Sequence, residues 1–122
     1  MIEEAAEKHD LPLGFEGEVF SPNYAIYIKA KINIGEAKIA SLGQSGLSKV
    51  EGNMELNIFA HIGQEELVAI EANSISNDFI KGTNFNFVNG FGILLSPSVL
   101  SPISDGVRTS CLIKIPFYAF MQ

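Results

Sequence analysis

The chain has few of the residues from which chemical sites are built. Its 122 residues include one cysteine, two histidines and no tryptophan. The single thiol of Cys111 excludes an internal disulfide framework, and one cysteine with two histidines is too small a set for a structural zinc site. These scarcities predict a protein that works without a metal or another cofactor.

Positive charge is also scarce, with 8 Lys and Arg against 14 Asp and Glu and a formal net charge of −6. Phosphate binding depends on lysine and arginine, so this balance argues against nucleic acid as the main partner. The longest nearly apolar stretch, Phe91–Leu95, is far shorter than the about 20 residues that span a bilayer. The opening MIEEAAEKHD lacks the basic and apolar parts of a signal peptide. We therefore expect a protein of the reducing cytoplasm with no membrane partner.

The chain does have enough apolar residues, 47% of the total, to fold as a single domain over 1–122. Its clearest pattern is the alternation over Tyr24–Ile34, where every even position is apolar or small. The same alternation returns over Val50–Ala60. A period of two predicts half-buried strands. Pairing them antiparallel about residue 42 places Lys29 opposite Glu55, which is a favourable cross-strand pair.

The remaining segments predict a mixture of helices and short strands. The expected helices are a short one at Ile2–His9 and the main one at about 64–79, where apolar residues recur at helical spacing. Further strands are expected at Phe15–Phe20, Thr83–Val88, Phe91–Leu95 and Cys111–Phe117. The order predicts an α+β, two-layer domain: one mainly antiparallel sheet with a long hairpin, and both helices packed on one face.

Two proline-containing segments set limits on this sheet. Pro97 and Pro102 predict an irregular path over Ser96–Gly106. Pro116 cannot donate a hydrogen bond to a ladder, so the final strand is expected to lie at an edge there or to end there.

The connection between the two best strands, Gly35–Lys49, is far longer than an ordinary hairpin loop. Long loops in compact domains are commonly functional, so this segment is either a partner-contacting arm or a mobile tip that orders only in an assembly. Tyr27 and Phe59 add apolar groups to the polar side of their strands, which suggests cover from another subunit. The candidate protein-interaction residues are therefore Leu42, Gly43, Gln44, Ser45, Gly46, Leu47, Tyr27 and Phe59.

No set of residues assembles a catalytic site. His9 at a helix end is expected to complement the helix dipole, and His61 after a strand is expected to be solvated or to act as a cap. Cys111 alternates inward, as a packed core thiol would. Adjacent glutamates such as Glu65 and Glu66 diverge on a helix and form a poor acid–base pair. The sequence thus predicts a protein that is not an enzyme.

Six groups of short motifs follow one another over about residues 15–120. They are Phe15-Glu16 with Phe20-Ser21-Pro22; Tyr24–Ile28; Leu42–Leu47 followed by Val50-Glu51-Gly52; Gly63–Phe79 closed by Lys81-Gly82-Thr83; Ser96–Val99; and Asp105-Gly106 with Ile115-Pro116-Phe117. Their order resembles that of the tail-terminator proteins of long-tailed bacteriophages and prophages.

The resemblance implies a structural protein that caps the tail tube, stops its polymerisation and provides a surface for head–tail joining. It implies a hexameric ring of identical subunits, formed alone or only on the tube, with the tail tube protein and a head–tail connector protein as partners. The protein would then reside in the virion tail, and in the host cytoplasm during assembly. Three alternatives stay open: a related neck or tail-completion protein, a small ligand-binding module, and a minor enzyme.

Overall fold

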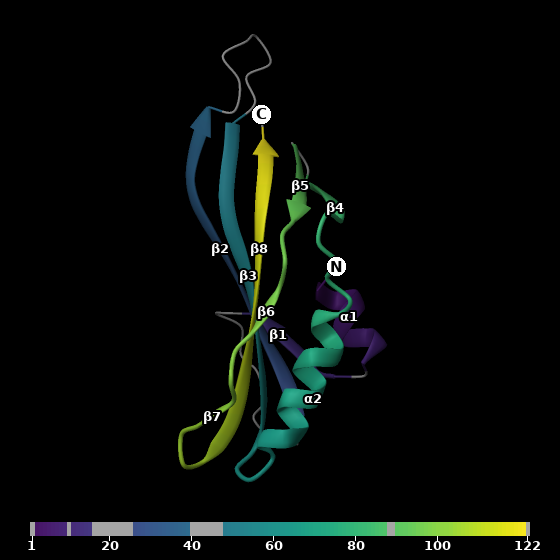
Figure 1. The fold of residues 1–122 in the computed structure, drawn as a ribbon, viewed down its shortest axis with the longest axis vertical. Coiled ribbons are helices and arrows are strands. Elements are labelled where there is room, and N and C mark those ends of the chain that lie inside the picture. The colour runs from purple at the N-terminus through teal and green to yellow at the C-terminus, as the bar shows by residue number, and fades with distance from the viewer. Residues whose placement is uncertain (1, 10, 16–25, 40–47, 88–89, 122) are drawn as a thin grey trace.

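The computed structural model describes residues 2–9, 11–15, 26–39, 48–87 and 90–121. Within them the fold is α+β, with two helices and a curled sheet of eight strands (Figure 1). In chain order the elements are α1 (Ile2–Lys8), β1 (Leu13–Phe15), β2 (Ile26–Ile39), β3 (Ser48–His61), α2 (Glu65–Ser76), β4 (Asn84–Phe87), β5 (Gly90–Leu94), β6 (Ser98–Val99), β7 (Ile103–Ser104) and β8 (Arg108–Met121).

Three strands of 14 residues, β2, β3 and β8, form the centre of the sheet. The order of neighbours is β1-β2-β3-β8-β5-β4, and β6 and β7 also pair with β8. β1 is parallel to β2, whereas the other pairings are antiparallel. Strands β5, β6 and β7 follow one another along the edge of β8 that β3 leaves open, so together they act as one interrupted strand.

The register of β2 on β3 differs by two residues from the predicted one. Ile26 lies opposite Ala60, so Lys31 and not Lys29 faces Glu55, and Lys29 faces Asn57. A shift of two keeps every side chain on its expected side of the sheet, because strand side chains alternate with a period of two. The charge criterion could not separate the two registers, since each places a lysine opposite Glu55.

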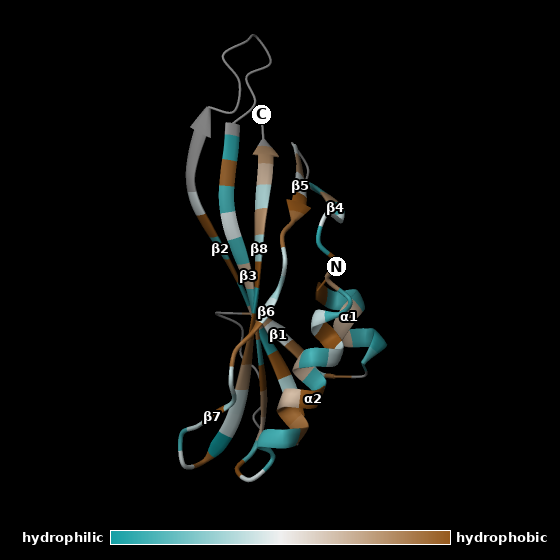
Figure 2. Ribbon diagram, in the orientation of Figure 1, coloured by the Kyte–Doolittle hydropathy of each residue, from teal (hydrophilic) through white to brown (hydrophobic). Residues whose placement is uncertain are grey.

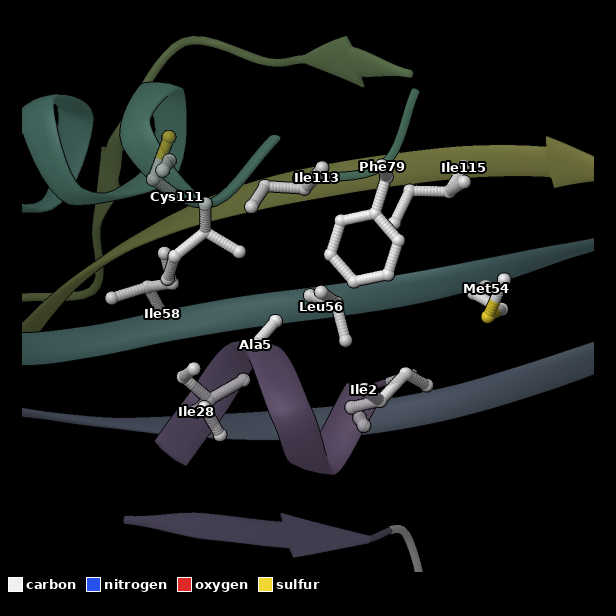
Figure 3. Close-up of a cluster of buried hydrophobic side chains, with 14 of the residues drawn as sticks. Ile2, Ala5, Ile28, Met54, Leu56, Ile58, Phe79, Cys111, Ile113 and Ile115 are labelled. Carbon is white, nitrogen blue, oxygen red and sulfur yellow. The ribbon is translucent and has the colours of Figure 1, made fainter. Parts of the chain in front are cut away.

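The core covers one side of the sheet, which we call the core face. β2, β3 and β8 send alternate side chains to it, and adjacent rows such as Ala30, Leu56 and Ile113 run across the three strands. Figure 2 shows the resulting alternation of hydropathy along β3. Figure 3 shows buried side chains of β2, β3 and β8 gathered beside α1, with Ile2 and Ala5 of that helix among them.

The apolar stripe of α2 explains why it packs here. Val68, Ala72 and Ile75 recur at spacings of four and three and are fully buried, and Phe79 continues the same line after the helix. Full burial of one such large side chain contributes about 1.5–3 kcal/mol. The helix ends at Ser76, three residues before the predicted end. In the segment that follows the helix, Gly82 adopts φ +87° and donates its N–H to the carbonyl of Leu94.

The expectation for Pro116 was met only on one side of β8. β8 is an inner strand, flanked by β3 on one side and by β5–β7 on the other, and it continues through Pro116 to Met121. The carbonyl of Pro116 accepts the N–H of Leu95, so the imino nitrogen also points to the side of β5 and β6. The missing donor therefore faces the break between β5 and β6, where the ladder has no partner strand.

One other strand prediction needs correction, and a further one is tested only at its first residue. Ser96–Gly106, predicted to be irregular, contains β6 and β7, each of which forms two pairs with β8. The strand expected at Phe15–Phe20 is described only at its first residue, because β1 covers Leu13–Phe15 and residues 16–20 lie outside the described part of the chain.

Candidate interaction surface

The side of the sheet away from the core, here called the outer face, holds the predicted pair Tyr27 and Phe59. They lie opposite each other in the register of β2 and β3, and their rings stack with centroids 5.2 Å apart. Arg108 donates a hydrogen bond from Nη1 to the Tyr27 hydroxyl and lies over its ring. Tyr27 is only 6% exposed. The prediction that it offers an exposed contact was therefore wrong, because Phe59 and Arg108 cover it.

The other predicted contact residues, Leu42–Leu47, lie outside the described residues. The structure describes the strands that lead to them, since β2 and β3 stay paired as far as Ile39 and Ser48. The predicted connection Gly35–Lys49 was therefore too long, because both of its ends belong to strands. The register shifts between Ile34 and Ala37, which marks a β-bulge.

Two exposed isoleucines on β2 are the clearest apolar surface near the end of the sheet where β2 stops and β3 begins. Ile32 and Ile34 point to the core face, where they were predicted to be buried, yet they are 50% and 61% exposed. Their neighbours in the same rows, Met54 and Phe117, are buried. The difference arises because β2 extends past α1, as Figure 1 shows, and β1 pairs with β2 only from Ile28 to Ala30.

A shallow hollow of about 380 Å³ adjoins these isoleucines. It is lined by Asn33, Ile34, Gly35, Glu51, Gly52 and Asn53, at the point where β2 bulges away from β3. Asn33 donates from Nδ2 to Oδ1 of Asn53 across the two strands, a contact of 3.0 Å. The hollow thus combines one apolar side chain with amide and carboxylate groups.

The outer face carries an aromatic group at the same end of the sheet. Phe91 of β5 stacks on Phe120 of β8 with centroids 5.2 Å apart, and Lys49 Nζ lies 3.8 Å from the centroid of the Tyr118 ring. Phe91 is 40% exposed. In the sequence Phe91 alternates with Gly90 and Gly92, which was the available signal that this residue faces away from the core.

A second cluster joins α1 to the segment after α2. Asp78 accepts a 2.7 Å contact from Lys8 Nζ and lies 2.7 Å from His9 Nε2. Burial of Asp78 would raise the pKa of its carboxyl, but the hydrogen bonds from Lys8 and His9 outweigh burial and hold that pKa below its ordinary value. A helix-dipole role was all that could be predicted for His9, because its partner Asp78 is 69 residues away in the chain.

An open hollow of about 440 Å³ lies beside this cluster, lined by Glu4, Ala5, Lys8, Asp78, Thr83 and Phe85. Its lysine and aspartate already bind each other, which leaves no nucleophile–base pair among these residues. Across the described part of the chain, no three His, Cys, Asp or Glu side chains come together as a metal site would require. None of the described helices has the length and apolar character to cross a membrane.

Cys111 and His61 have the ordinary roles predicted for them. Cys111 is 1% exposed within the core, and its thiol donates to the carbonyl of Leu100 at 3.1 Å. Burial raises the pKa of this thiol, which makes it a poor nucleophile. His61 is exposed at the end of β3.

Comparison with known proteins identifies the fold and leaves the function open. No protein-family model matches the chain, and no curated protein matches it. Six chains of solved structures are similar. One of them has a TM-score of 0.74 and 16% sequence identity, over 98% of this chain and 86% of that chain. At this identity the similarity shows a shared fold alone.

Proposed function

We propose that this protein is a structural component of a phage or prophage tail, which caps the tail tube, stops its polymerisation and offers a surface for head–tail joining. The proposal rests on the order of sequence motifs along residues 15–120 and on the surface at one end of the sheet. It includes the two-layer arrangement, in which the long hairpin of β2 and β3 extends beyond the helices. The tail tube protein and a head–tail connector protein are the partners.

The observation that carries the proposal is the exposure of Ile32 and Ile34. Two large apolar side chains, adjacent on one side of β2, are half or more exposed on a strand that runs toward Leu42–Leu47. Burial of such a side chain contributes about 1.5–3 kcal/mol when it is complete. Cover from another protein subunit would supply that burial, and an adjacent apolar pair is a better docking surface than isolated exposed residues.

The edge of β2 supports the same role. In the register of the described strands, β1 ends its pairing at Ala30, so β2 from Lys31 onward pairs within them only with β3. A strand edge presents N–H and C=O groups that can pair with a strand of another chain. A subunit that docked there would bury Ile32 and Ile34 and extend the sheet in the same step.

Capping is then a matter of geometry, with no chemical step. Head-to-tail contacts between identical subunits close into a ring when the rotation per subunit completes a circle. A ring ends a tube when one face fits the tube and the other rejects further tube subunits. By its resemblance to tail terminators, the ring would contain six subunits.

The ligand-binding alternative has less support. A binding module needs a concave apolar pocket with a few convergent polar groups. The larger hollow is open, and two of its three charged groups, Lys8 and Asp78, bind each other. A related neck protein stays a serious alternative, and the experiment below separates it from a terminator.

The test is polymerisation of the tail tube protein encoded with this chain, with tube lengths measured by electron microscopy. We expect the wild type to give tubes of uniform length with one capped end. Ile32→Asp/Ile34→Asp should remain folded by circular dichroism and give long, uncapped tubes. The matched control is Ile103→Asp on β7, because Ile103 is also strongly exposed but lies far along the sheet from Ile34.

A deletion of Leu42–Leu47 tests the arm separately. If tubes keep their normal length without these residues, the prediction of a contact arm is wrong. The role of Ile32 and Ile34 is then still tested by the double aspartate variant. Tubes that grow without limit beside folded wild-type protein would contradict the capping function. If the wild-type protein fails to limit tube length but phage heads join tails only when it is present, the protein is a neck component.

A further inference from the structure

Within the described part of the chain, the two helices and the outer face of the sheet carry net charges of opposite sign. The two helices together carry six glutamates and one lysine, a net charge of −5. On the outer face of β2, β3 and β8, the described side chains comprise five cations and two carboxylates, a net charge of +3. These cations are Lys29, Lys31, Lys49, Arg108 and Lys114, and the carboxylates are Glu51 and Glu55.

The helical side also exposes apolar residues. On α2, Glu66 and Ile70 lie four residues apart and point away from the buried line of Val68, Ala72 and Ile75. Ile70 is 58% exposed, and Leu67 beside it is 40% exposed. We call the outward side of the two helices, with these two apolar side chains and the glutamates around them, the acidic helix face.

The opposite surface has matching features. Lys29 and Lys31 of β2 and Lys114 of β8 are exposed on the outer face, and Leu112 and Pro116 lie half-buried on either side of Lys114. We call this surface the basic sheet face. Glu55 lies between Lys31 and Lys114 in the same row of the sheet face and pairs with Lys114, so the contrast between the two faces is one of net charge. Each face combines apolar side chains with a net charge, and the two net charges are opposite in sign.

We propose that the acidic helix face of one copy of this chain docks on the basic sheet face of a second copy. Opposite potentials favour this encounter and disfavour contacts between two like faces. The faces differ, so the contact is head-to-tail: each subunit keeps one free face of each kind, and the assembly closes into a ring or grows as a filament. The apolar residues supply the centre of the contact and the charges its rim.

This inference names the faces that a capping ring would use, and it rests on the proposed function for its biological role. Docking of one copy on another depends only on the opposite net charges of the two faces. The experiment therefore measures self-association without any tail tube, so that its outcome is independent of capping.

The experiment is sedimentation velocity on the full chain and two variants, each altered on one face. Lys29→Glu/Lys31→Glu makes the sheet face acidic, and Glu66→Lys/Ile70→Lys makes the helix face less acidic and removes an apolar anchor. We expect the wild type to self-associate and to dissociate as the salt concentration rises, because salt screens exposed charges. Each variant alone should be a monomer at concentrations where the wild type is oligomeric.

An equal mixture of the two variants gives the decisive result. The first keeps its helix face and the second keeps its sheet face, so the mixture should form dimers and nothing larger. Lys81→Glu, an exposed lysine outside both faces, is the matched control for charge and should associate like the wild type. Circular dichroism of each variant guards against loss of the fold.

Three outcomes overturn the inference. They are a wild type that stays monomeric up to about 1 mM, variants that associate like the wild type, and a mixture that gives no dimer. Tube capping by a protein that fails these tests would leave the proposed function intact. Head-to-tail association by a protein that never caps tubes would support the inference and remove that function.

Discussion

His9 Nε2 lies 2.7 Å from Asp78 Oδ2, and this contact fastens the end of α1 to the segment that follows α2. Lys8 Nζ reaches the other carboxylate oxygen at the same distance. A helix of seven residues is unstable alone and needs tertiary contacts. Asp78 therefore has a structural role: it holds α1 so that Ile2, Ala5 and Ala6 stay buried against the sheet.

Asp78→Asn should destabilise the protein by about 1–3 kcal/mol, because hydrogen bonds to charged groups contribute about that much. The neutral amide keeps the shape of the side chain but loses the charge that attracts Lys8. Urea unfolding followed by circular dichroism measures the change as a lower midpoint with an unchanged slope. Glu7→Gln, an exposed residue of α1, is the control and should stay within about 0.5 kcal/mol of the wild type. Equal stability of the two variants would show that the Asp78 contacts contribute little.

The same carboxylate predicts how stability depends on pH. The folded-state pKa of Asp78 lies below its ordinary value of 3.8, so the folded protein binds this proton more weakly than the unfolded chain. The stabilisation is fully present above the unfolded pKa and is lost as the pH falls through the folded one. The difference in unfolding free energy between the wild type and Asp78→Asn should therefore shrink as the pH falls below about 5. A difference that stays constant down to about pH 2 would contradict this origin.

The strands and helices with strong periodicity could be predicted from the sequence, because local patterns determine them. β3 carries the alternation of Val50–Ala60, and α2 carries the stripe of Val68, Ala72 and Ile75. The inner position of β8 could not be predicted, because Pro116 is tolerated only through a break in the neighbouring strands. That break is a property of the tertiary pairing and leaves no local signal.

The candidate surface was predictable to a smaller degree. Alternation placed Ile32 and Ile34 on the core face correctly, but it carries no information about how far α1 extends over that face. Tyr27 was placed on the outer face, and its burial depends on Arg108, which is 81 residues away in the chain. The exposure of a side chain depends on whether a segment distant in the sequence covers it. Local periodicity carries no information about such tertiary contacts.

Two glycines opposite aromatic rings predict different costs of adding a methyl group. A Cβ on Gly52 would lie 2.5 Å from the main-chain oxygen of Asn33 and 2.6 Å from the Phe117 ring. The three atoms nearest to a Cβ on Gly92 would all belong to the half-buried ring of Phe85, and a side chain can shift more easily than main chain. Overpacking costs about 1–3 kcal/mol, so we expect Gly52→Ala near the upper end and Gly92→Ala near the lower end.

Thermal or urea unfolding of the two alanine variants measures this difference. Phe85→Leu/Gly92→Ala is the matched control, because the smaller side chain leaves room for the new methyl group and should recover part of the loss. If Gly92→Ala is the more damaging substitution, Phe85 is held more rigidly than its exposure indicates.

We expect the buried thiol of Cys111 to react only when the core of the protein opens. It is 1% exposed between β3 and β6, and burial raises its pKa, so both access and thiolate formation are suppressed. The native protein should therefore react with Ellman's reagent at least about 100-fold more slowly than the chain unfolded in urea, because reaction waits for an opening of the core. Cys111→Ala should give no signal, which establishes that the reaction is at this residue. The reaction rate of the native protein should also rise in Gly52→Ala, since a less stable sheet opens more often. A native rate close to that of the unfolded chain would mean that β6 separates readily from β8, and the edge of the sheet would then be less stable than its pairing implies.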